Sequence, residues 1–153
     1  MPAKFNLFEF QRRAMPVLLG WASGSIASGL LWLAAPDQWL RGLGSQFAGW
    51  GLIDGIIALL ALRGAARNAD RLAAGAVDAQ EHDRQARQFE AIVWANAALD
   101  VGYALGGYGL LKRSPDHEGR RGMGVGIMIQ GLFLLAWDVA LALLVRSKRR
   151  AAA

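Results

Sequence analysis

Apolar residues fall into four long blocks along the chain, and charged residues separate these blocks from one another. The blocks cover approximately residues 14–35, 43–62, 91–111 and 123–145. Each holds about 20 residues, which is the length that an α-helix needs to cross roughly 30 Å of hydrocarbon. None of the four contains lysine or arginine. The pattern therefore predicts an all-α membrane protein, a four-transmembrane-helix bundle that forms a single domain over residues 1–153.

The longest polar segment, residues 63–90, separates the second block from the third. It is rich in alanine, arginine, aspartate and glutamine and contains no proline, a composition that favours helix. We expect the second helix to extend beyond the membrane to about Gly75. A further helix would then return into the third block, so that the segment forms a helical hairpin in the cytoplasm.

Lysine and arginine are distributed unevenly between the two ends of the blocks. Twelve of the 17 lie before the first block, between the second and third, or after the fourth, and five lie in the other two connections. By the positive-inside rule, this asymmetry places both termini on the cytoplasmic side of the membrane. Contact with anionic head groups then accounts for the net charge of +5, and nucleic acid is not an expected partner.

The two halves of the chain repeat at a constant offset of 80 residues. Gly29-Leu30-Leu31 recurs as Gly109-Leu110-Leu111, and Gly51-Leu52 recurs as Gly131-Leu132. The repeat predicts two helical hairpins of the same orientation that pack about a pseudo-twofold axis along the membrane normal. Glycines four residues apart let helices approach closely within a bundle, and some of them could instead serve a homodimer.

Three carboxylates lie inside the predicted spans, and they are Asp54, Asp100 and Asp138. An ionised aspartate near the bilayer centre costs about 2.5–3.5 kcal/mol, so we expect each to face the interior of the bundle. Helical spacing adds neighbours with amide, phenol or indole groups, which can hydrogen-bond to a carboxylate or hold a cation. The candidate ligand-binding residues are Asp100, Asn96, Tyr103, Asp138, Asp54, Trp137, Trp50 and Gln130.

Because the spans contain no basic residue, these acids have three ways to be accommodated. They are protonated and hydrogen-bonded, they share a bound cation, or they are wetted by a pocket. Two functions remain open. The first is an intramembrane polar pocket that binds or transports a small amphipathic or cationic ligand or a lipid. The second is a structural or accessory subunit, which could be homo-oligomeric, whose polar residues only fasten the helices together.

Enzymatic and metal chemistry have little support in the sequence. The chain contains no cysteine, and both histidines, His82 and His117, fall in the polar connections. Two separated histidines are typical of solvated residues rather than of a metal site. No nucleophile is accompanied by a base. We therefore expect neither an enzyme, nor a cofactor, nor a bound metal.

Four segments carry a resemblance to a known family of uncharacterised bacterial membrane proteins, which are small and have four helices. The segments are Gly20-Trp21-Ala22, Gln46-Phe47-Ala48-Gly49-Trp50, the stretch NAALDVGYALGG from Asn96, and QGLFLLAWD from Gln130. This family has no known activity, so the resemblance implies the topology and the polar positions alone. The chain departs from the family at Ser25, Gly51 and Asp54, where asparagine is expected. That departure favours a polar, uncharged role for position 54.

Overall fold

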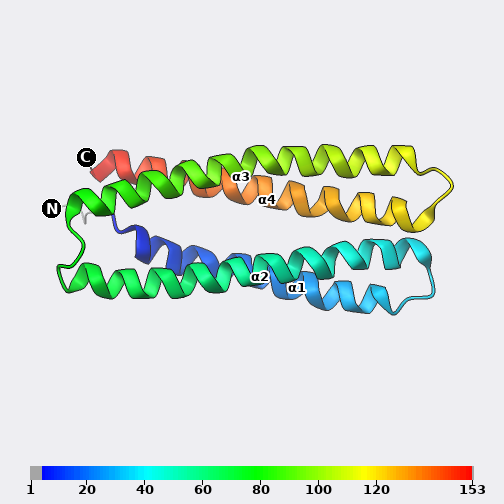
Figure 1. Ribbon diagram of the computed structural model, residues 1–153, viewed down its shortest axis with the longest axis horizontal. Helices are drawn as coiled ribbons and strands as arrows, with labels where there is room; N and C mark the ends of the chain where they lie inside the picture. The colour runs from blue at the N-terminus through cyan, green and yellow to red at the C-terminus, as the bar shows by residue number, and fades with distance from the viewer. Residues whose placement is uncertain (1–4, 153) are drawn as a thin grey trace.

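The computed structural model describes residues 5–152, which form four long helices (Figure 1). No β-strand occurs in this range, so the predicted all-α four-helix bundle is confirmed. The helices are α1 (Leu7–Leu33), α2 (Gln38–Ala73), α3 (Ala79–Arg113) and α4 (Glu118–Ala152).

Local chemistry explains where the helices begin and where the chain reverses. The side chains of Asn6, Asp37 and Asp78 accept hydrogen bonds from backbone N–H groups in the first turns of α1, α2 and α3, which otherwise lack partners. After α2 the backbone turns at Gly75, whose φ is +71°, a conformation that costs glycine little. The N–H of Ala76 donates to the Arg71 carbonyl at 2.9 Å, which closes the helix end. Both expected extensions, residues 63–73 and 79–90, are helical.

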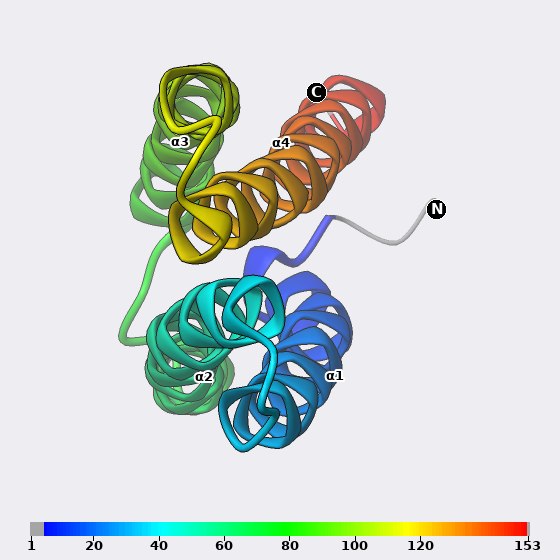
Figure 2. The same cartoon turned by 90° about the vertical axis from the view of Figure 1, so that its right-hand side faces the viewer.

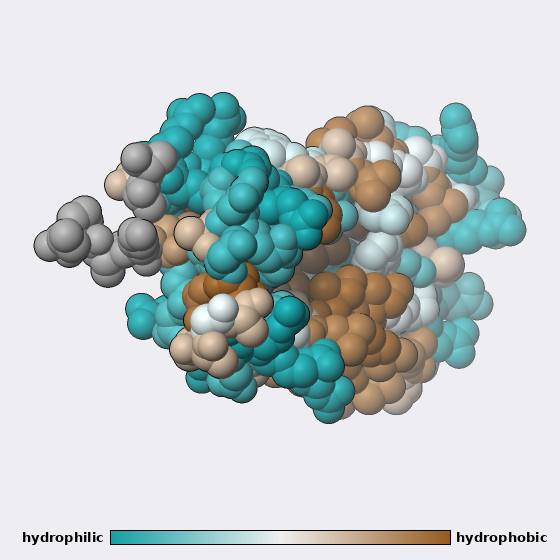
Figure 3. Space-filling view, turned by 60° about the vertical axis from the view of Figure 1, so that its left-hand side comes forward, coloured by the Kyte–Doolittle hydropathy of each residue, from teal (hydrophilic) through white to brown (hydrophobic). Residues whose placement is uncertain are grey.

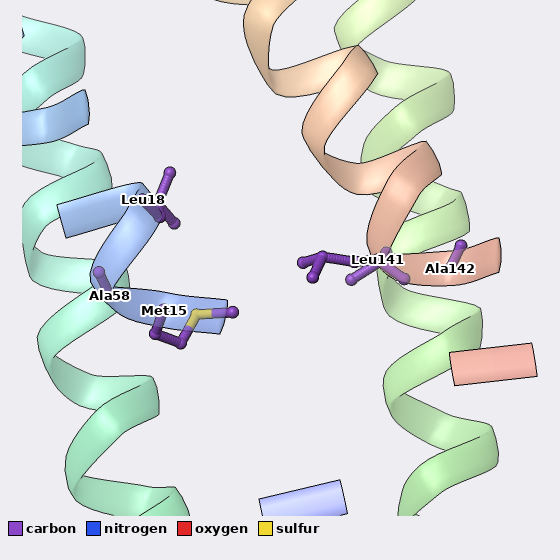
Figure 4. Close-up of a cluster of buried hydrophobic side chains, with 6 residues drawn as sticks. Met15, Leu18, Ala58, Leu141 and Ala142 are labelled. Carbon is purple, nitrogen blue, oxygen red and sulfur yellow. The ribbon is translucent and has the colours of Figure 1, made fainter. Parts of the chain in front are cut away.

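The bundle consists of two antiparallel hairpins. Helix α1 packs along α2, and α3 packs along α4, whereas α2 against α4 forms the main contact between the hairpins (Figures 1 and 2). Apolar side chains from all four helices meet in one buried cluster (Figure 4), whose members are Met15, Leu18, Ala58, Val93, Leu141 and Ala142. The core is narrow, because each helix contributes only one face to it.

Glycines allow α2 and α4 to touch through their backbones. A side chain at Gly42 would overlap the carbonyl of Gly119, and one at Gly122 would overlap the carbonyl of Trp39. Since a backbone atom cannot move aside as a side chain can, only glycine fits at these two positions. The hairpins are therefore joined most closely near the starts of α2 and α4.

The outside of the bundle is strongly apolar along its middle. Side chains such as Leu31 (74% exposed) and Leu105 (65% exposed) point away from the core, and hydrophobic patches lie between hydrophilic ends (Figure 3). Three helices, α1, α2 and α4, are long and apolar enough to cross a membrane. Helix α3 has a similar length of 35 residues but a less apolar composition. An exposed apolar surface of this extent is typical of proteins that contact lipid or another protein.

Candidate functional site

The three predicted carboxylates lie together inside the bundle. Asp54 projects from α2, Asp100 from α3 and Asp138 from α4, with exposed fractions of 2%, 4% and 8%. Their carboxyl groups are close enough to interact electrostatically, Asp54 with Asp100 and Asp138 with both. Three consecutive helices thus bring together aspartates that are far apart in sequence.

Two oxygens in this centre have no hydrogen-bond partner among the residues that the structure describes. They are Oδ2 of Asp54 and Oδ2 of Asp100. No ion pair within residues 5–152 involves either carboxylate or Asp138. A buried carboxylate without a partner is unfavourable by several kcal/mol. The acid centre is therefore satisfied only by a proton, a cation or water.

Glycine packing brings α3 and α4 together at the level of the acids. A Cβ at Gly131 of α4 would lie 3.1 Å from the backbone oxygen of Asp100 on α3. On the other hairpin, a Cβ at Gly51 of α2 would lie 2.8 Å from the backbone oxygen of Ala22 on α1. The Gly131 contact thus holds the backbones of α3 and α4, which carry Asp100 and Asp138, close together.

An aromatic pair connects α2 with α3 beside the acids. The rings of Trp50 and Tyr103 meet edge to face, with centroids 4.9 Å apart. Trp50 precedes Asp54 by four residues, and Tyr103 follows Asp100 by three, so each ring lies on the same helical face as its acid. Tyr103 is 41% exposed, and the pair therefore stands between the acids and the outside of the bundle.

Asn96 also belongs to this side of the bundle. It is exposed on α3, and its side chain approaches the carboxyl group of Asp138. Because Asn96 precedes Asp100 by four residues, the same side of α3 carries both the amide and the acid. The structure thus groups five of the predicted residues, namely Asp54, Asp100, Asp138, Trp50 and Tyr103, with Asn96 at their edge.

Gln130 lies elsewhere, between α4 and α1. Its side chain is completely buried; its Oε1 accepts a hydrogen bond from Trp21 Nε1 at 2.8 Å, and its Nε2 donates to Ser25 Oγ at 3.2 Å. The Trp21 ring in turn stacks on Phe133 at a centroid distance of 3.8 Å. Trp137 packs against the apolar core cluster. Gln130 and Trp137 therefore already have partners within the protein.

Comparison with known proteins places the chain in a family. A model described as "Family of unknown function (DUF6992)" matches residues 17–139, which is most of the chain. The chain belongs to the DUF6992 family. The predicted resemblance to a four-helix family of unknown function is thereby confirmed, whereas bacterial origin stays a prediction. No curated protein and no solved structure matches the sequence.

The match to DUF6992 includes all three buried carboxylates and ends before the last turns of α4. There, beyond the matched region, lies a group of charged residues that the sequence analysis did not single out. Arg149 donates to Glu90 at 2.6 Å and to Asp83 at 3.2 Å, which ties the end of α4 to the start of α3. The signal in the sequence was the spacing of Arg146, Arg149 and Arg150, which places three guanidinium groups on one helical face.

This end of the DUF6992 protein contains a pocket of about 870 Å³. Its charged lining residues are Arg87, Arg146, Arg149, Arg150, Asp83 and Glu90, and its apolar ones include Phe5, Leu72 and Ala86. The pocket lies at the end of the bundle where the α2–α3 turn and the C-terminal end of α4 are found (Figure 1). It is separate from the acid centre, because Arg146 follows Asp138 by eight residues, about 12 Å along α4.

His82 was expected to be solvated, and it is so only in part. The side chain is half-buried, and its Nε2 accepts a hydrogen bond from the backbone N–H of Leu7 at 3.0 Å. The ring also meets Phe8 edge to face, with centroids 5.4 Å apart. Burial lowers the pKa of His82 from its ordinary value, although the neighbouring Asp83 acts in the opposite direction. A neutral imidazole thus serves as a second cap for α1.

Proposed function

We propose that this protein spans the membrane four times. Helices α1, α2 and α4 have the required length and apolar composition. Helix α3 crosses with them because it runs antiparallel to α4 along a closely packed interface and has almost the same length. Its polar residues Asn96 and Asp100 make it less apolar and are accommodated by contact with the rest of the bundle. The distribution of lysine and arginine supports a cytoplasmic position for both termini, and the membrane in this proposal is a bacterial inner membrane.

The two hairpins are copies of one unit in this proposal, and the glycine contacts support it. Gly51 on α2 lies against Ala22 on α1, and Gly131 on α4 lies against Asp100 on α3. Gly51 and Gly131, the glycines of the second helix in each hairpin, are 80 residues apart. Ala22 and Asp100, the residues that they contact on the first helix, are 78 residues apart. The same two offsets relate Gly29 and Gly44 to Gly107 and Gly124, which also pack against each other's backbones.

The offset of 78 replaces the constant offset of 80 for the first helix of each hairpin. A side chain at Gly109 would meet nothing within 4 Å, whereas one at Gly107 would lie 2.6 Å from the Gly124 carbonyl. Gly107 is therefore the counterpart of Gly29. Helix α3 continues farther than α1 before its loop, which accounts for the difference between the two offsets.

The acid centre binds a small cationic ligand. The observation that carries this function is the pair of unpartnered oxygens on Asp54 and Asp100, both deep inside the bundle. A cation would satisfy both and would reduce the repulsion between the carboxyl groups. An organic cation fits better than a metal ion, because no group of three acidic or histidine side chains within residues 5–152 is arranged to hold a metal.

The aromatic pair supports an organic ligand. Trp50 and Tyr103 lie on the same helical faces as Asp54 and Asp100, and a positive charge is attracted to aromatic rings over distances of about 6 Å. Their apolar parts would contact the hydrocarbon portion of the ligand. An amine or quaternary ammonium group with an apolar substituent thus matches both the acids and the rings. Binding or transport of such an amphipathic cation is the activity we assign to the protein.

A second function is favoured by Gln130. Its hydrogen bonds to Trp21 and Ser25 fasten α4 to α1, and its complete burial keeps it out of contact with a ligand. If the acids act in the same way, as protonated groups that only hold helices together, the protein is a structural or accessory subunit, as a monomer or a homo-oligomer.

Direct binding measurements separate the two functions. The purified full chain in neutral detergent would be titrated with tetraphenylphosphonium, a permanently charged apolar cation, and binding would be followed by calorimetry and by the quenching of tryptophan fluorescence. We expect saturable binding that Asp54→Asn and Asp100→Asn each weaken by about tenfold or more. Asp70→Asn, which changes an exposed carboxylate on α2, should bind as the parent does.

The result that contradicts the cation site is equally clear. If the parent protein binds none of the cations tried, including smaller alkylammonium ions, the acids have no such ligand. Equal weakening by Asp70→Asn would show that binding follows net charge alone. Unchanged folding of the Asp100→Asn variant, checked by circular dichroism and size-exclusion chromatography, makes a loss of binding specific.

A further inference from the structure

The pocket at the end of the bundle carries more positive charge than its own carboxylates neutralise. Arg149 pairs with Glu90 and Asp83, and Arg87 pairs with Asp83. The positive charges of Arg87 and Arg149 are therefore neutralised by the negative charges of Asp83 and Glu90. The other two arginines of the lining, Arg146 and Arg150, give the pocket its excess charge.

These two arginines lie four residues apart on α4 and so face the same way. Arg146 is 49% exposed and forms a long ion pair with Glu90, at 3.9 Å, and Arg150 is exposed. Like charges at this spacing repel each other. An anion between them would remove the repulsion and accept hydrogen bonds from both guanidinium groups.

We propose that this pocket binds a phosphate ester, with the phosphate held by Arg146 and Arg150. A guanidinium group presents paired N–H donors that match two phosphate oxygens, and such charge-assisted bonds are strong. The apolar side chains of Phe5, Leu72 and Ala86 would contact the organic part of the ester. Arg149, already fixed by its carboxylate partners, holds α4 in place and shapes the pocket.

A phosphate ester could reach the pocket from two sources, a lipid head group or a soluble metabolite. Both would meet the same arginines. If the bundle spans a membrane, the pocket lies where a head group would be, just beyond the apolar part of the helices. The site is independent of the acid centre, so either one can fail experimentally while the other stands.

The test uses the purified full chain in neutral detergent. In one arm, inorganic phosphate and glycerol phosphate are titrated, and the thermal unfolding midpoint is recorded. In the other, the protein is reconstituted into vesicles of phosphatidylcholine and phosphatidylglycerol, both of which carry a phosphate ester, and the retained molecules of each lipid are counted by native mass spectrometry. We expect saturable binding in at least one arm, weakened about tenfold by the double substitution Arg146→Gln with Arg150→Gln. The arm that responds identifies the source of the phosphate.

The matched control is a second arginine pair on the same side of the protein. Arg63 and Arg67 are also four residues apart and exposed, and they lie on α2 outside the pocket lining. Arg63→Gln with Arg67→Gln should bind as the parent does. Equal loss in this control would overturn the proposal, because attraction would then be diffuse. Absence of saturable binding by the parent protein in both arms would also overturn it.

Conservative substitution guards against a folding artefact. Arg146→Lys with Arg150→Lys keeps both charges but removes the paired donors, and it should bind more weakly than the parent and more tightly than the glutamine variant. Protection of residues 146–150 from hydrogen exchange on addition of inorganic phosphate to the parent protein provides a measurement without any substitution. If phosphate binds and gives no protection there, the site lies elsewhere and the assignment is wrong.

Discussion

Gly42 on α2 and Gly122 on α4 occupy reciprocal positions, each against a backbone carbonyl of the other helix. Replacing either with alanine would force the helices apart at the main contact between the hairpins. We expect Gly122→Ala to lower the free energy of unfolding by about 1–3 kcal/mol, as overpacking of a tight interface does. Titration with a denaturing detergent would measure this loss.

Gly102 provides the control for that substitution. It lies in the interior of α3, and a side chain there would meet nothing within 4 Å. Gly102→Ala should leave stability unchanged or raise it by up to about 1 kcal/mol, because alanine favours helix. If the two alanine variants are equally stable, the contact between α2 and α4 is not as close as described.

The buried amide of Gln130 should contribute measurably to stability. Gln130→Leu keeps the volume but leaves the Trp21 N–H without its acceptor, and we expect a loss of about 1–2 kcal/mol. Gln46→Leu is the matched control, since the Gln46 amide makes only a long 3.5 Å contact with the adjacent Ser45. Unfolding followed by tryptophan fluorescence would distinguish the two, and equal effects would contradict a special role for Gln130.

Arg149 and Glu90 form a pair that is largely shielded from solvent, with side-chain exposures of 21% and 16%. A double-mutant cycle with Arg149→Gln and Glu90→Gln should yield a coupling energy of about 1 kcal/mol or more. The exposed pair of Arg13 and Glu9 should give less than about 0.5 kcal/mol in the same cycle. A coupling no larger than that of the exposed pair would show that the α3–α4 connection is weak.

The start of α1 should depend on pH through His82. Because burial lowers its pKa in the folded state, the unfolded chain binds the proton more readily. The stabilising effect is complete above the ordinary pKa of 6.5 and is lost as the pH falls below it, through the lower folded pKa. Hydrogen exchange at residues 7–10 should therefore accelerate on acidification from pH 7.

His82→Gln tests this dependence, since the glutamine oxygen can accept the Leu7 N–H without titrating. Exchange at the start of α1 in this variant should no longer respond to pH over the same window, after correction for the intrinsic exchange rate. His117→Gln, which alters an exposed loop histidine, should behave as the parent does. A response retained in His82→Gln would assign the effect to another group.

The absence of native cysteine makes the topology directly testable. Ala76→Cys in the α2–α3 turn and Asp116→Cys in the α3–α4 loop place single thiols at opposite ends of the bundle. In intact cells, a membrane-impermeant maleimide should label position 116 and spare position 76, which reacts only after lysis. The reverse result would invert the proposed orientation, and labelling of both would contradict a four-span arrangement.

Hydropathy and helix-forming composition were sufficient to predict the four helices and the reversal near Gly75, because these depend on local properties. The burial of Asp54 and Asp100 also followed from the cost of exposing an acid to lipid. The rotation of each helix did not follow. Gln130 and Asp138 lie eight residues apart on α4, and only the packing of α1 shows that Gln130 serves a different interface. The bond between His82 and Leu7 spans 75 residues, which no local pattern reveals.

Gly42 and Gly122 fix the two hairpins against each other near one end of the bundle, so any rotation of one hairpin relative to the other would pivot about this contact. Asp54 lies twelve residues beyond Gly42, which corresponds to about 18 Å along α2. A small rotation at the glycine contact would therefore be amplified into a larger separation at the acids. The glycine contact between α2 and α4 thus limits how far Asp54 can move from the carboxylates of the other hairpin.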